Sequence, residues 1–135
     1  MDQTQAQVAS LCAPISELDE VFNPNAVKVV RDQNEYALYF SRAPIPWDRE
    51  SFPANPSSYQ SSHFRHIGIY SYTAGFLRRY ITWPTCALEQ IESLEQLRIL
   101  NSGEKIFVPA VAQAPEAGID TQQDLDRVNA LLSKW

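Results

Sequence analysis

The feature that most limits the possible folds is an alternating run at residues 66–72, with the sequence HIGIYSY. In an extended strand, successive side chains point to opposite faces, so Ile67 and Ile69 share one face. The opposite face carries His66, Gly68, Tyr70 and Tyr72. We therefore predict a strand whose isoleucines face a core. Its other face carries polar rings beside a gap at Gly68, where another group can approach the backbone closely.

A second segment, Leu88 to Leu100, has the spacing of one amphipathic helix. Its apolar stripe consists of Leu88, Ile91, Leu94 and Ile99. Glu95 falls inside that stripe, where a carboxylate is costly unless a cation, an arginine or a hydroxyl-rich ligand pairs with it. The alternative is a glutamate at the helix edge that reaches solvent or bridges to Arg98. The spacing leaves both interpretations open.

Composition limits the class of protein. The chain has 135 residues, which suits one domain, and its 44% hydrophobic and 20% charged content is typical of soluble proteins. The net charge of -5 argues against a nucleic-acid surface, although a few arginines could still hold a small anion. The sequence has no apolar run of about 18 residues and no signal-peptide pattern. We therefore expect a cytoplasmic protein without a membrane partner, with Cys12 and Cys86 as free thiols.

The remaining runs predict strands and short helices. A brief helix follows Ser16, which has the character of an N-cap, and a second covers residues 73–83 with Phe76, Leu77 and Tyr80 inward. We expect an antiparallel hairpin from two strands joined by the turn-like residues 32–35. Pro109 places the last strand at an edge or a bulge. The predicted strands are residues 8–15, 26–31, 36–42 and 105–111, and a last helix is predicted at residues 122–132.

Arg42 ends a strand face that is otherwise apolar and aromatic: Tyr36, Leu38 and Phe40. It could reach into a pocket to bind an anion, or extend to solvent at the strand end. Residues 43–62 follow, with four of the nine prolines, and predict an irregular surface excursion. Its Ile45-Pro46-Trp47 segment could pack against a partner subunit or fold back onto its own domain.

Asp120 lies in a Gly-Ile-Asp-Thr segment before the last predicted helix. It could sit beside a helix cap, because Thr121 with Asp124 resembles a capping box. It could also be a magnesium ligand, because Mg²⁺ takes one or two protein carboxylates together with phosphate oxygens. The chain has only four glycines and none of the glycine-rich motifs that cradle phosphate.

Several motifs, taken together and in order, resemble one family, the 3-deoxy-manno-octulosonate cytidylyltransferases (CMP-Kdo synthetases). The resemblance covers residues from about 8 to 132. The motifs are FNPNAVKVV at 22–30, YALYFSRA at 36–43, IPWDR at 45–49, RHIGIY at 65–70, LEQIE at 88–92, LEQLR at 94–98, GEKI at 103–106 and GIDT at 118–121.

The resemblance is to the C-terminal half of that family. It implies an α/β fold: the C-terminal half of a Rossmann-like nucleotidyltransferase (GT-A-like) fold, with a mixed sheet and a β-hairpin dimerisation excursion. Residues 1–135 would form a single partial domain for sugar-acid binding and dimerisation. The family's first half holds CTP on a basic, glycine-containing loop and carries a magnesium-binding aspartate. We expect that half to be missing here.

The resemblance also implies an activity, the coupling of CTP and Kdo to CMP-Kdo and pyrophosphate for lipopolysaccharide biosynthesis, in a homodimer. By position, His66 and Tyr70 would line the Kdo pocket, and Glu95 would bind sugar hydroxyls. Arg42 would face the anionic ligands, and Asp120 would be the catalytic residue that holds Mg²⁺. The alternatives are an inactive, self-associating structural fragment or an enzyme for another sugar acid such as sialic acid. The LEQLR and RHxGIY motifs argue against the latter.

Overall fold

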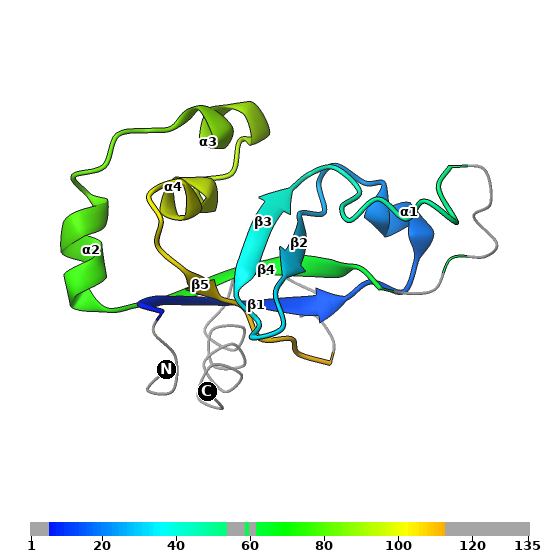
Figure 1. Cartoon of the computed structure of the whole chain (residues 1–135), viewed down its shortest axis with the longest axis horizontal. Helices are drawn as coiled ribbons and strands as arrows, with labels where there is room; N and C mark the ends of the chain where they lie inside the picture. The colour runs from blue at the N-terminus through cyan, green and yellow to red at the C-terminus, as the bar shows by residue number, and fades with distance from the viewer. Residues whose placement is uncertain (1–5, 54–58, 60–61, 113–135) are drawn as a thin grey trace, which may run out of the picture.

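The computed structural model describes residues 6–53, 59 and 62–112 (Figure 1). Its strands form one mixed sheet in the order β3-β2-β4-β1-β5, in which only the β1–β5 pairing is parallel. The strands are β1 Val8–Pro14, β2 Lys28–Arg31, β3 Ala37–Ser41, β4 Phe64–Tyr72 and β5 Ile106–Phe107. The helices are α1 Leu18–Val21, α2 Ala74–Tyr80, α3 Ala87–Glu92 and α4 Gln96–Asn101. The predicted mixed α/β sheet is confirmed.

Strands β1 and β4 form the centre of the sheet, and an irregularity interrupts their pairing. Ala9 lies opposite Ser71, and Leu11 lies opposite Ile67. Residues 68–70 of β4 therefore face a single residue of β1, Ser10. Bulges of this kind bend a strand and re-aim its side chains, and they are common beside functional sites.

The predicted hairpin is confirmed, and a side chain closes its turn. The Asp32 carboxylate accepts hydrogen bonds from the backbone N–H groups of Asn34 at 2.8 Å and Tyr36 at 3.0 Å. Beyond the turn, the Val108 N–H donates to the Glu35 carbonyl at 2.8 Å. The tip of the hairpin is thereby fastened to the chain just after β5.

One face of β3 is unevenly buried. Phe40 is fully buried in the main core, whereas Leu38 is 59% exposed. β3 is an edge strand, and α4 packs against it. The apolar face that Leu38 and Phe40 share is therefore buried at Phe40 and exposed at Leu38.

The single helix expected over residues 88–100 is also wrong. The segment forms α3 and α4, separated at Ser93, which ends α3 with a left-handed φ of 56°. The break changes the helical phase, so Ile91 is 79% exposed while Leu97 is fully buried. Glu95 takes the N-cap position of α4 and is exposed, so it does not lie within a buried stripe.

Two smaller expectations at helix ends have different outcomes. Thr73 caps α2 by accepting a hydrogen bond from the Phe76 N–H, and Phe76 is buried as predicted, but Leu77 is 44% exposed. Glu17, and not Ser16, takes the N-cap position of α1. The Glu17 side chain makes no cap hydrogen bond, so α1 begins without a side-chain cap.

Side chains pack on both faces of the sheet. Ile67 belongs to a small cluster with Leu11 and Ala13, as its isoleucine face predicts. The larger cluster lies on the opposite face and includes Phe40, Phe76 and Leu97, with Tyr70 packed against it. Figure 1 shows α3 and α4 above the β1–β4 pair, with α2 at one end and α1 at the other. The polar-ring face of β4 therefore lies beneath helices.

Two further sequence expectations concern the thiols and the membrane. Cys12 is buried and Cys86 is partly buried, and both are free thiols, as predicted. No helix in the described part of the chain is long and apolar enough to cross a bilayer.

Candidate functional site

Two adjoining cavities open over the polar-ring face of β4. The larger holds about 560 Å³ and is lined by His66, Gly68 and Tyr70, together with residues of the α1–β2 loop. The smaller holds about 220 Å³ and lies toward Tyr72. Both are lined by Tyr70, Leu94 and Gln96. The gap predicted at Gly68 is real, since a Cβ built at that glycine would meet no atom within 4 Å.

His66 is held on two sides inside the larger cavity. Its Nε2 atom lies 2.8 Å from the Ser10 hydroxyl, and its ring meets the Phe40 ring edge-on at a centroid distance of 4.8 Å. Burial lowers the pKa of His66 to about 4. The imidazole is therefore neutral near pH 7 and carries one N–H and one acceptor nitrogen.

Tyr70 joins the two cavities. Its ring lies 5.5 Å from that of His66 and stacks on Tyr72 at 5.7 Å. Burial, followed by the neighbouring Tyr72 and Glu95, raises the pKa of Tyr70 above its usual range, so its hydroxyl stays protonated. Within the described residues no protein group hydrogen-bonds this hydroxyl, which leaves it able to bind a ligand.

Glu95 and Gln96 bring polar groups from the start of α4. Glu95 lines the smaller cavity with Tyr72 and Tyr80, and it makes no side-chain cap hydrogen bond. The alternative of a Glu95–Arg98 bridge is wrong, because the Arg98 guanidinium pairs with Glu89 at 2.6 Å. The structure therefore places His66, Tyr70 and Glu95 around the two cavities, and their roles in binding stay predictions.

Sequence reasoning missed Gln96. Its side chain is only 8% exposed and lines both cavities. The single-helix prediction gave no reason to examine it. The signal available was its position next to Glu95 at the start of a helix.

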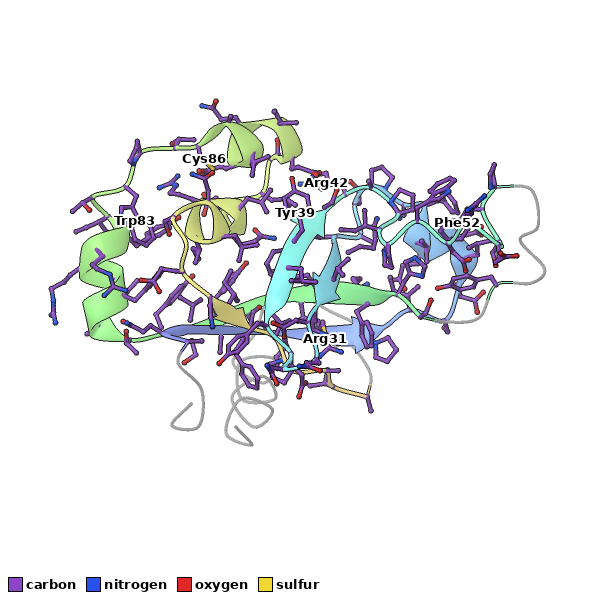
Figure 2. All side chains as sticks on the ribbon, in the orientation of Figure 1. Arg31, Tyr39, Arg42, Phe52, Trp83 and Cys86 are labelled. Carbon is purple, nitrogen blue, oxygen red and sulfur yellow. The ribbon has the colours of Figure 1, made fainter. Side chains whose placement is uncertain are left out.

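Arg42 lies outside both cavities. Figure 2 shows it with Tyr39 at the end of β3 nearest α3. Its guanidinium donates to three backbone carbonyls, those of Glu92 at 2.7 Å, Pro24 at 3.0 Å and Ser93 at 3.1 Å. It lines neither cavity. Anion binding by Arg42 stays a prediction, and this geometry favours a structural role.

The α1–β2 loop forms one wall of the larger cavity, and two cationic side chains bind at this wall. Lys28 is fully buried and donates from Nζ to the Asn23 carbonyl at 2.8 Å. At the same wall, Arg65 pairs with Glu20 at 2.9 Å. The larger cavity therefore has both a cation and a carboxylate at its edge, beside neutral hydrogen-bonding groups.

The magnesium prediction depends on a residue outside the described part of the chain. Asp120 lies there, as does the helix expected at residues 122–132. Among the residues that the structure describes, no group of three or more His, Cys, Asp or Glu side chains could hold a metal ion. The magnesium site therefore stays a prediction.

Comparison with known proteins then identifies the family. A family profile described as Cytidylyltransferase matches residues 1–106. The chain belongs to the cytidylyltransferase family. Two of its relatives are named 3-deoxy-manno-octulosonate cytidylyltransferase. That of Aeromonas hydrophila subsp. hydrophila is 59% identical over 128 residues, covering 95% of this chain and 51% of the relative. That of Serratia proteamaculans is 59% identical over 125 residues, covering 93% and 50%.

A solved structure supports the same fold for this cytidylyltransferase chain. CMP:2-keto-3-deoxy-manno-octonic acid synthetase, solved in complex with CTP, superposes with a TM-score of 0.74 at 41% identity. The match covers 98% of this chain and 52% of that one. The chain thus spans about half the length of the relatives that it matches. The predicted family and nucleotidyltransferase fold are confirmed, and the dimerisation role of the excursion stays a prediction.

Proposed function

We propose that this chain supplies the sugar-acid half of a cytidylyltransferase that couples CTP and Kdo to CMP-Kdo and pyrophosphate. One observation carries the proposal. The Tyr70 hydroxyl, the Glu95 carboxylate and the Gln96 amide line two adjoining cavities with the neutral His66 ring. Hydroxyl groups both donate and accept hydrogen bonds, so a polyhydroxylated ligand suits this mixture of groups.

Different residues of the cavities would contact different parts of the ligand. His66 and Tyr70 offer neutral hydrogen bonds, while Glu95 accepts from sugar hydroxyls. Arg65, at the edge of the larger cavity, offers a cation to the sugar's carboxylate. These contacts would hold the sugar in one orientation, which accelerates a reaction by proximity and moves no proton.

The reaction is nucleotidyl transfer. The anomeric hydroxyl of Kdo forms a new bond to the α-phosphorus of CTP, the bond from that phosphorus to the bridging oxygen breaks, and pyrophosphate leaves. The hydroxyl proton is lost to solvent. Magnesium, which we assign to Asp120 on the family resemblance, would supply charge neutralisation on the phosphates.

The assembled enzyme would be a cytoplasmic homodimer whose product serves lipopolysaccharide biosynthesis. The excursion after β3 is the proposed dimer contact. Its Trp47 is 55% exposed and meets Phe22 edge-on at 6.5 Å. An aromatic pair on a surface suits a partner subunit.

The test is pyrophosphate release with CTP, Kdo and magnesium chloride. We expect none from the 135-residue chain alone. Release should appear when the chain is fused to the preceding half of the Aeromonas hydrophila relative. N-acetylneuraminate in place of Kdo is the control for another sugar acid. Equal rates with both sugars, or an inactive fusion that is folded, would contradict the proposal.

A further inference from the structure

Ser10 occupies the point where the register of β1 and β4 changes. It is fully buried and faces the three bulged residues of β4. Its hydroxyl oxygen lies 3.0 Å from the Ile67 carbonyl oxygen and 2.8 Å from that of Ile69. The same oxygen lies 2.8 Å from Nε2 of His66. One hydroxyl thus lies within hydrogen-bond distance of three polar atoms, and Ser10 itself has no contact with solvent.

The single proton of that hydroxyl decides the state of the imidazole. Carbonyl oxygens can only accept, so the hydroxyl proton must point to Ile67 or Ile69 for either contact to be favourable. If the proton pointed to His66 instead, both carbonyls would face an oxygen lone pair. When the hydroxyl donates its proton to a carbonyl oxygen, the serine oxygen can only accept a hydrogen bond from His66, so Nε2 must carry a hydrogen.

We propose that Ser10 is a positioning residue that fixes His66 in the Nε2–H tautomer and so presents Nδ1 to the larger cavity as a hydrogen-bond acceptor. Within the described residues, Nδ1 has no hydrogen-bond partner. Nδ1 is also accessible to solvent. Among the described residues, Nε of Arg31 is the only buried side-chain nitrogen or oxygen that lacks a hydrogen-bond partner, so the unpartnered Nδ1 is not buried. Nδ1 is therefore open to a ligand.

The tautomer selects the kind of ligand group that can bind. An Nδ1 lone pair takes a hydroxyl or N–H and repels a carboxylate oxygen. The next step rests on the proposed function. A hydroxyl of the sugar acid would hydrogen-bond to Nδ1 of His66, and the carboxylate of the sugar acid would bind at another part of the cavity. The Phe40 ring, 4.8 Å away, keeps the imidazole plane from rotating out of this arrangement.

Nitrogen NMR of the ¹⁵N-histidine-labelled full chain tests the tautomer directly. The chain has two histidines, so the signals can be assigned by comparing His66→Gln with wild type. We expect the wild-type His66 to show a protonated Nε2 and an unprotonated Nδ1 at neutral pH. A protonated Nδ1 in wild type would overturn the proposal, and this result needs no Ser10 variant.

Variants then test the serine. Ser10→Ala should give a mixture of His66 tautomers, and Ser10→Thr, which keeps the hydroxyl, should restore the single one. His63 is an internal reference, because its Nε2 lies 2.7 Å from the Pro46 carbonyl, far along the chain from Ser10. Ser41→Ala, which removes another buried serine hydroxyl, should leave both histidines unchanged. A single Nε2–H tautomer in Ser10→Ala would refute the role of Ser10.

A titration separates this inference from the proposed function. Kdo added to the labelled chain should shift the Nδ1 signal of His66, and Ser10→Ala should weaken Kdo binding by roughly tenfold, about the value of one hydrogen bond. If the tautomer responds to Ser10 but Kdo shifts nothing, the proposed sugar acid is wrong while the Ser10–His66 relationship stands.

Discussion

Arg42 and Glu92 bind each other's backbone. The Arg42 Nε donates to the Glu92 carbonyl at 2.7 Å, and the Glu92 carboxylate accepts from the Arg42 N–H at 3.1 Å. The other two guanidinium nitrogens reach Pro24 and Ser93. Arg42 therefore ties the end of β3 to two segments, the α1–β2 loop and the α3–α4 turn, that form walls of the cavities.

Arg42→Lys should therefore weaken the fold although it keeps the charge. One ammonium group cannot reach three separate carbonyls with the geometry of a guanidinium. We expect a loss of about 1 to 2 kcal/mol in the free energy of unfolding, measured by urea denaturation. Arg49→Lys, at an exposed site, is the control and should change little. An unchanged midpoint for Arg42→Lys would instead favour the anion-binding interpretation.

Stability should depend on His66 between about pH 4 and pH 6.5. Its folded pKa of about 4 lies below the unfolded value of about 6.5, so the unfolded state binds the proton first as pH falls. Stability is thus complete above pH 6.5 and falls as pH drops through that window, by roughly 3 kcal/mol in all. His66→Gln should remove this part of the pH dependence. Parallel wild-type and variant curves would refute the burial argument.

The sheet was predictable because its signal is local. Strands β1 and β4 alternate or run apolar over many residues, and the Asp32 turn carries its own hydrogen-bonding side chain. The polar-ring face of β4 followed from the same alternation. Three of the predicted site residues, His66, Tyr70 and Glu95, accordingly lie around the cavities.

What could not be predicted depends on contacts distant in sequence. Ser93 adopts a left-handed conformation that is unusual outside glycine, and nothing in its neighbours announced the helix break there. Ser10 meets His66 across 56 positions of the chain. In the sequence it is simply a serine in an apolar strand. For Arg42 the sequence allows an anion-binding or a solvent-exposed side chain, whereas its guanidinium donates to backbone carbonyls.

Asp120→Ala should abolish turnover in the fusion with the CTP-binding half, if Asp120 holds magnesium. Pyrophosphate release is the measurement, with Asp124→Ala as the matched control from the same segment. The prediction comes from the family motif, because Asp120 lies outside the described residues. Near-normal turnover in Asp120→Ala would remove the assignment.

Glu95→Gln should weaken the binding of Kdo more than the binding of CTP. The carboxylate lines the smaller cavity beside Tyr72 and Tyr80, on the proposed sugar side. Replacing it by an amide keeps the size but loses charge-assisted acceptance of sugar hydroxyls, and we expect the KM for Kdo to rise by roughly tenfold. Because Glu95 is exposed, the unfolding midpoint should stay the same. Equal changes in both KM values would count against the sugar-side assignment.

Gly68→Ala and Gly68→Val separate folding from binding. A Cβ at Gly68 meets no atom within 4 Å, and this glycine has no positive φ, so both variants should fold. Stability should rise by about 0.5 to 1 kcal/mol, because the unfolded chain loses freedom. The added methyl groups would project toward the larger cavity, so the KM for Kdo should rise, more for valine than for alanine. Gly75→Ala in α2, where a Cβ also meets nothing, should stabilise the chain without changing that KM. If Gly68→Val binds Kdo normally, the sugar does not occupy the gap beside His66.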